Sequence, residues 1–277
     1  MSILVALLKQ RHRYYRSLLV VEVLALLGLS SLQRAPQLMG LLYLLITGVV
    51  VVFDSPLLAS HRLQTKGLLE RLNGRHRNHI ERVLWRRRVI VWGWLVCLAM
   101  EVVWQSALVL NPTLAVTLST PHLVVWLALI LQMLWSLVNA LAEEPQFTGA
   151  VLMGAAAGYL LVGFAGGILL TSLFVLEPTA FNVPQQAGGL AAGIVHAPRL
   201  LGAAFGCLTT LGSPALKLDH LTALSAANAI TMMGQLYLAI MIAGVLGKPR
   251  PRVSGLQARA HRSAMDPMAN PAGRRRC

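Results

Sequence analysis

Long apolar stretches constrain the fold of this chain more than any other feature of its sequence. Each can supply the ~20 apolar residues with which an α-helix crosses the roughly 30 Å hydrocarbon core of a bilayer. No stretch alternates apolar and polar residues over ten positions, which disfavours a β-barrel. The sequence therefore predicts an all-α membrane protein with six transmembrane helices. The predicted spans are 17–33, 36–53, 89–110, 119–142, 148–176 and 220–247.

The amount and placement of charge disfavour a soluble protein. Only 12% of the 277 residues are charged, about half the share found in soluble domains. The net charge of +14 comes from basic residues that lie between the apolar stretches and are not gathered on one domain. We therefore expect the lipid bilayer, and no nucleic acid, as a partner.

The basic residues also predict the orientation of the chain. Six crossings place the N-terminus, the 54–88 loop and the C-terminal tail on one face, which then carries 21 Lys and Arg residues. The opposite face carries three, namely Arg34, Arg199 and Lys217. Because basic loops stay in the cytoplasm, we predict a multi-pass protein of the plasma (inner) membrane with both termini cytoplasmic.

Two basic segments lie outside the predicted spans. The 54–88 loop mixes arginines with leucines and Trp85, so it could lie on anionic lipid head groups as short amphipathic helices, or be an ordinary cytoplasmic loop. The tail, 248–277, is rich in Pro, Arg, Ser and Ala and is expected to be disordered.

The segment between the fifth and sixth spans is too apolar for an ordinary loop. Residues 178–197 are rich in Pro and Gly, and Pro198 suits the first turn of a helix. About ten apolar residues follow, enough to rise about 15 Å, or half a membrane. They lead into the Thr-Thr-x-Gly sequence of 209–212. Non-helical backbone at that depth needs protein or water around it, so we predict a re-entrant pore helix and loop whose negative helix end favours a cation.

Two patches resemble the bacterial two-helix-pore family of potassium channels, within the ion channel superfamily. Leu208-Thr-Thr-Leu-Gly212 resembles the start of the selectivity filter, and residues 230–243, ITMMGQLYLAIMIA, resemble the inner helix. The resemblance covers about 145–247. It implies a homotetramer around a central axis, with potassium or another monovalent cation as the transported ion and no cofactor. The implied ion pathway passes Thr209, Thr210, Leu211, Gly212 and Ser213 and then the inner helix near Gly234, a hinge or a close-packing glycine, and Tyr237.

The filter-like patch departs from the family after Gly212. Ser213, Pro214 and Ala215 stand where the family has an aromatic residue, a second Gly and Asp. Proline is locked near φ −65° and cannot adopt the backbone angles of that Gly. We therefore expect weak or lost potassium selectivity. The predicted span 119–142 contains no Lys or Arg, so no arginine-based voltage sensor is expected.

These expectations divide the chain into four parts. They are a cytoplasmic N-terminus (1–16), a four-helix membrane domain (17–142), a pore module of outer helix, pore helix, filter-like loop and inner helix (143–247), and the basic tail (248–277). Glu22 and Glu101 lie inside predicted spans, where carboxyl groups are costly, so each is a functional candidate or hydrogen-bonds a neighbouring helix. The glycine pairs 154/158 and 163/167 predict close packing of the outer helix on the inner helix.

Other functions stay open at this point. The altered filter could belong to a non-conducting, channel-derived membrane scaffold. Glu22 and Glu101 could serve a proton-coupled small-solute transporter. His196, before Pro198, is expected in a solvated loop at the external mouth. No spacing of Cys, His or acidic residues predicts a metal site or an enzyme's catalytic group.

Overall fold

A computed structural model of the protein describes residues 2–54, 74–142, 144, 148–183 and 191–246. The secondary structure in these ranges is helical, apart from a single β-bridge between Phe181 and Leu216. Two short 3₁₀ helices, η1 (Pro36–Leu38) and η3 (Pro178–Ala180), join longer elements. The α-helices are α1 (Ser2–Leu27), α2 (Leu29–Leu32), α3 (Met39–Asp54), α5 (Gly74–Leu110), α6 (Pro112–Ala142), α7 (Gly149–Leu176), α8 (Ala191–Leu208) and α9 (Leu221–Leu246).

Among the described residues, four helices are long and apolar enough to cross a membrane. They cover Arg88–Leu110, Thr113–Ala142, Gly149–Leu176 and Leu221–Gly244, and correspond to the last four predicted spans. The first two predicted spans are present as the hairpin of α1 and α3. The apolar part of α3, Met39–Val49, is shorter than a membrane crossing, and α1 is not among the four helices that qualify. The described part of the chain therefore confirms four of the six predicted spans.

The basic segments are only partly described. The predicted 54–88 loop ends earlier than expected, because α5 begins at Gly74 and runs unbroken into the apolar stretch. Residues 55–73 and the tail 248–277 lie outside the described part of the chain, and so do the expectations for lipid contact and disorder there.

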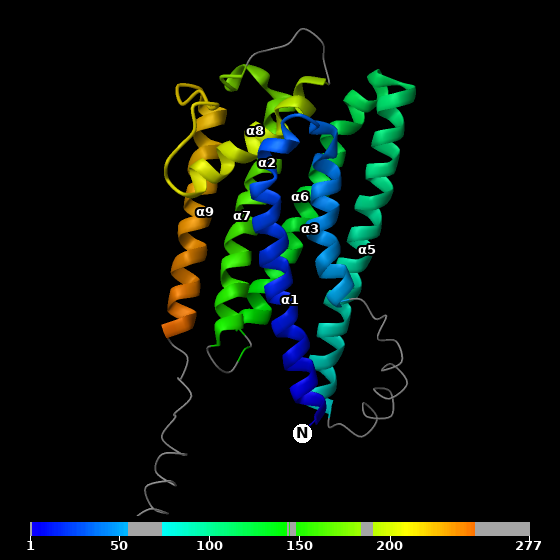
Figure 1. Ribbon diagram of the computed structural model, residues 1–277, viewed down its shortest axis with the longest axis vertical. Coiled ribbons are helices and arrows are strands. Elements are labelled where there is room, and N and C mark those ends of the chain that lie inside the picture. Colours follow the sequence, from blue (N-terminus) through cyan, green and yellow to red (C-terminus); the bar gives the residue numbers. More distant parts are fainter. Residues whose placement is uncertain (1, 55–73, 143, 145–147, 184–190, 247–277) are drawn as a thin grey trace, which may run out of the picture.

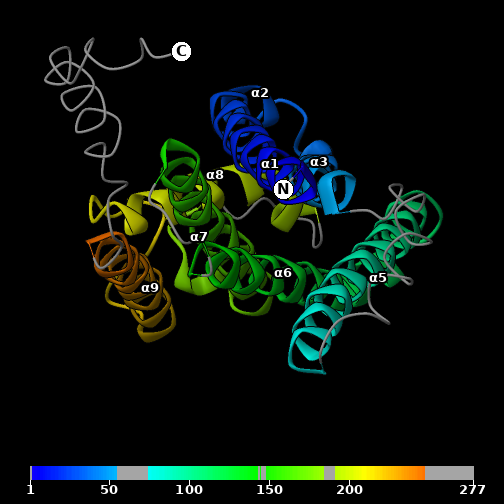
Figure 2. The same ribbon diagram turned by 90° about the horizontal axis from the view of Figure 1, so that it is seen from below.

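The long helices lie side by side around α7. Seen from below, α9, α7, α6 and α5 follow one another, and the hairpin of α1 and α3 covers one side of this row (Figure 2). In α7, 67% of the apolar stretch is buried, against 28% in α9. Helix α7 is thus the centre of the fold, and α9 and α5 lie at the two ends of the row.

Small residues let other helices come close to α7. A β-carbon at Gly158 would overlap the Tyr237 hydroxyl of α9. A β-carbon at Gly163 or Gly167 would overlap side chains of α8. The first glycine pair therefore packs in part on α9, as predicted, whereas the second pair packs on α8.

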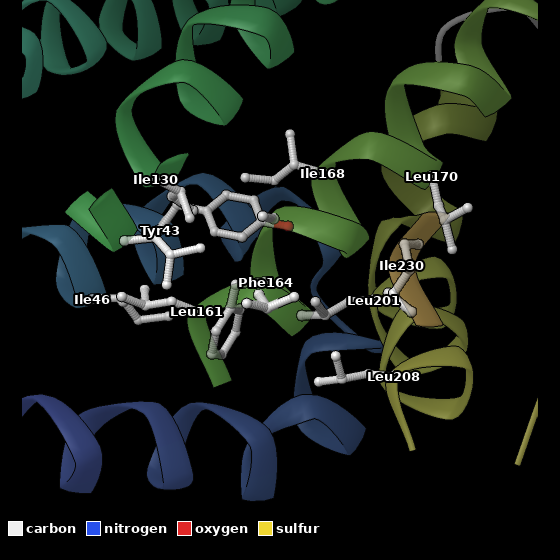
Figure 3. Packing of buried hydrophobic residues seen from close by; sticks show 14 of the residues in the cluster. Tyr43, Ile46, Ile130, Leu161, Phe164, Ile168, Leu170, Leu201, Leu208 and Ile230 are labelled. Carbon is white, nitrogen blue, oxygen red and sulfur yellow. The ribbon is translucent and has the colours of Figure 1, made fainter. Parts of the chain in front are cut away.

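The buried side chains connect these helices into one core. Figure 3 shows Phe164 of α7 beside Leu201 and Leu208 of α8, with Ile230 of α9 beyond them. The ring of Phe164 meets that of Phe205 on α8 edge to face, with centroids 5.4 Å apart. This core fixes the position of α8, and with it the loop that follows.

Candidate functional sites

Helix α8 is longer than the sequence predicted. It begins at Ala191 and contains Pro198 in its interior, so its 18 residues measure about 27 Å. His196, expected in a solvated loop, is a buried helical residue whose ring lies 5.6 Å from that of Phe174. Helix α8 lies in the upper part of the bundle, inclined to α7 and α9 (Figure 1). The expectations that the helix starts at Pro198 and that His196 lies in a solvated loop were therefore wrong.

The C-terminal end of α8 is held from two sides. The Tyr159 hydroxyl of α7 donates to the carbonyl of Leu208 at 3.0 Å. The Thr231 hydroxyl of α9 donates to the carbonyl of Cys207 at 2.8 Å. The Leu208 side chain fills the space over Gly234, where a β-carbon would overlap it. These contacts form a clamp that positions the residues after Leu208.

The filter-like loop, residues 209–213, turns away from this clamp. Thr209, Thr210, Leu211 and Gly212 are exposed in the single chain, and Leu211 is 87% exposed. Thr210 and Gly212 have φ of 64° and 71°. A β-branched residue in the left-handed region is strained, and such strain gathers at functional sites. The Gly212 amide donates to the Gly206 carbonyl at 2.9 Å, which closes the turn.

The chain beyond Ser213 is tied back to η3. The backbone N–H of Asn182 donates to the carbonyl of Ala215 at 2.8 Å, and the side-chain amide of Asn182 donates to the carbonyl of Pro214 at 3.3 Å. Farther out, Glu177 at the end of α7 accepts from the Thr222 hydroxyl of α9 at 2.6 Å. The ends of α7 and α9 are thus joined above the loop.

Helix α9 has a packed face and an exposed face, on which polar residues are mixed with apolar ones such as Leu221, Met232 and Leu236. Gly234 and Tyr237 lie on the packed face, where the Tyr237 hydroxyl donates to the carbonyl of Ala155 at 2.9 Å. The opposite face carries the exposed residues Ser225, Asn228 and Gln235. At 100° per residue, Asn228 and Gln235 project about 160° and 140° away from the buried Ile230. The structure thus places the two inner-helix residues implied by the resemblance against other helices of the same chain.

Glu101 has a partner that sequence reasoning missed. Nε2 of His122 on α6 lies 2.7 Å from Oε2 of Glu101 on α5, and the two side chains are 6% and 4% exposed. Gln105 donates to Oε1 of Glu101 at 2.9 Å. Residue 101 lies ten positions before the turn at Asn111, and residue 122 eleven positions after it. An Asn-Pro turn at 111–112 would have predicted this pairing.

Glu22 lies in a different environment. It is fully buried on the face of α1 that also carries Leu18 and Ala25. Neither of its carboxyl oxygens has a hydrogen-bond partner in the described part of the chain. Glu22 and Glu101 thus share no hydrogen bond in the described part of the chain.

No three or more His, Cys, Asp or Glu side chains among the described residues are grouped to hold a metal ion. Cys97 and Cys207 are both buried. Comparison of the chain with protein-family models, curated proteins and solved structures found no match. The function has to be inferred from the geometry of the loop, α9 and the buried acids.

Proposed function

We propose that this chain is one subunit of a homotetrameric cation channel with weak or lost potassium selectivity and no arginine-based voltage sensor. One observation carries the proposal, which is the exposure of two amide side chains, Asn228 and Gln235, on the same helix that holds the start of the filter-like loop. Asn228 and Gln235 lie about 10 Å and 21 Å from the outer end of the helix, at 1.5 Å per residue. Amide side chains at those depths are costly against lipid and need water or protein. A water-filled pathway meets that need.

The loop supports the same proposal. Backbone without helical hydrogen bonds is tolerated at membrane depth only inside protein or beside water. Residues 209–212 are exposed in the single chain, so other copies of the chain or water have to cover them. One loop cannot enclose a path, whereas four copies around an axis bring four loops and four exposed faces of α9 together.

The expected loss of selectivity has a basis in the turn that follows the loop. A potassium filter stacks rings of carbonyl oxygens that replace the hydration shell of the ion. The carbonyls of Pro214 and Ala215 accept hydrogen bonds from Asn182. They are therefore engaged within the subunit. At most the inner rings, from Thr209 to Gly212, are left to contact an ion.

The proposed topology has six crossings with both termini in the cytoplasm of a plasma (inner) membrane. It counts α1 and α3 as the first two crossings and α8 with its loop as a re-entrant segment. The asymmetry of Lys and Arg supports this orientation. Exposed Trp92 and Trp135 lie toward the same end of the antiparallel pair α5 and α6, as expected of tryptophans near an interface.

The test is thiol accessibility combined with ion flux. In a Cys277→Ser background, Gln235→Cys should react with a charged, membrane-impermeant thiol reagent in liposomes. Ile240→Cys, which is 60% exposed on another side of α9, should react much more slowly. The reagent should also reduce thallium flux through the Gln235→Cys protein. Equal labelling of both positions, absence of flux or a monomeric mass would refute the channel.

One observation favours a second candidate, a channel-derived scaffold that does not conduct. Leu211 presents a large apolar side chain at the tip of the loop, and four such side chains would close a narrow path by excluding water. Ser213→Tyr combined with Pro214→Gly distinguishes the candidates. Potassium flux that appears only in the double variant would favour a closed scaffold, whereas flux in both proteins would favour the channel.

A further inference from the structure

Glu101 and His122 lie in a closed cage between α5 and α6. The Trp104 ring stacks on the His122 ring with centroids 4.7 Å apart and an interplanar angle of 5°. Nε1 of Trp126 lies 3.1 Å from Nε2 of His122. On the third side is Gly40 of α3, where a β-carbon would overlap the Glu101 carboxyl group. The two titratable groups are thus surrounded by aromatic rings and backbone.

The distances require a proton between the pair. A contact of 2.7 Å between Nε2 and Oε2 would be repulsive if both atoms presented lone pairs, so one of them carries a hydrogen. The Trp126 indole can only donate, and its Nε1 lies 3.1 Å from Nε2 of His122, so it donates there only when Nε2 is unprotonated. The site therefore accommodates the proton on His122 or on Glu101 with small movements of the Trp126 ring.

The cage can also hold a second proton. The indole face of Trp104 lies parallel to the imidazole and stabilises a positive charge on it. Gln105 keeps its hydrogen bond to Oε1 when the other oxygen is protonated. The other titratable groups beside the pair are Cys97, whose thiol donates to the carbonyl of Val125, and Tyr43, whose ring packs on Trp126. Neither supplies a competing charge near neutral pH.

We propose that Glu101 and His122 form an intramembrane proton-binding site, which is an ion pair with one shared proton at neutral pH and binds a second proton in acid. The second proton converts Glu101 to a carboxylic acid and leaves a cationic His122 against Trp104. The proposal does not depend on the pore. A change in the charge of the pair would reach the rest of the fold through Gly40. The Glu101 carboxyl group lies against Gly40, and η1, which ends two residues before Gly40, packs against α8.

The test is infrared difference spectroscopy of the purified full-length protein in lipid, between about pH 7 and pH 3, because the second proton enters a carboxyl group whose cationic partner favours its charged form. Acidification should produce the carbonyl stretch of a protonated carboxyl group. The band should shift when the seven glutamates carry ¹³C at their carboxyl groups, which assigns it to glutamate side chains.

The variants assign the band to a residue. The contribution of Glu101 should be absent in Glu101→Gln and present in Glu22→Gln, a matched loss of another buried carboxyl group. In His122→Gln it should already be present at neutral pH, because the carboxyl group has lost its cationic partner. If the pair had a purely structural role, the ¹³C-sensitive bands of Glu101→Gln and of the unmodified protein would be identical over this range. That result would overturn the proposal.

Discussion

The clamp at the end of α8 predicts an unequal cost for two conservative substitutions. In the described part of the chain, the Leu208 carbonyl accepts a hydrogen bond from Tyr159 alone, so Tyr159→Phe leaves it unsatisfied in the protein interior. The Cys207 carbonyl accepts from both Thr231 and the amide of Thr210, at 2.8 and 3.0 Å. Thr231→Val therefore leaves that carbonyl with one partner.

The magnitudes follow from this difference. An unsatisfied buried acceptor costs about 1–3 kcal/mol, and the loss of one of two hydrogen bonds costs about 0.5–1.5 kcal/mol. At roughly 2–4 °C per kcal/mol for a chain of this size, Tyr159→Phe should lower the midpoint of thermal unfolding by roughly 2–12 °C. Thr231→Val should lower it by less.

The assay is thermal unfolding of the detergent-solubilised protein, followed by tryptophan fluorescence, with both variants measured beside the unmodified chain. Thr231→Ser is the control that keeps the hydroxyl group, and it should lie closer to the unmodified protein than Thr231→Val. A larger effect of Thr231→Val than of Tyr159→Phe would refute this account of the clamp. In the proposed channel, Tyr159→Phe should also alter thallium flux, because the loop begins one residue after the released carbonyl.

Two further predictions use glycines with matched controls on the same helix. Gly234→Ala should destabilise the protein by about 1–3 kcal/mol, because its β-carbon would overlap a side chain of α8, whereas Gly244→Ala has open space and should be neutral or stabilising by up to about 1 kcal/mol. Thermal unfolding distinguishes the two. Gly40→Ala should displace the carboxyl group of Glu101 and alter the acid-induced infrared band, whereas Gly48→Ala on α3 makes only ordinary contacts and should leave the band unchanged; identical spectra for the two variants would contradict the close contact.

The long apolar helices were predictable because membrane crossing needs a minimum length of apolar sequence. The predicted span 148–176 differs by one residue from α7, Gly149–Leu176, and Thr148 is its N-cap, accepting from the Val151 amide. Helix ends set by tertiary contacts were not predictable in this way. Pro198 favours a first turn locally, yet the packing of α8 on α7 holds it within a longer helix.

The pairing of Glu101 with His122 depends on the register of two antiparallel helices. The predicted spans left 111–118 as a loop, which would have displaced the start of the second helix by about two turns. In the structure α6 begins at Pro112, directly after Asn111, and this tight turn places the two residues opposite each other. A local turn of one residue therefore decides whether the acid has a partner.

The role of α9 shows which sequence signal carries more information. The resemblance singled out Gly234 and Tyr237, but the small residues Ala223, Ala226, Ala227 and Gly234 share one face, which is the face buried against α7 and α8. Tyr237 lies on that face because Gly158 leaves room for its ring, and its hydroxyl finds the Ala155 carbonyl. Asn228 and Gln235 lie on the opposite face, together with apolar residues such as Met232 and Leu236. In a membrane helix, the periodicity of small and polar residues therefore separates the packing face from the face that needs water, and it assigns the proposed pathway to Asn228 and Gln235.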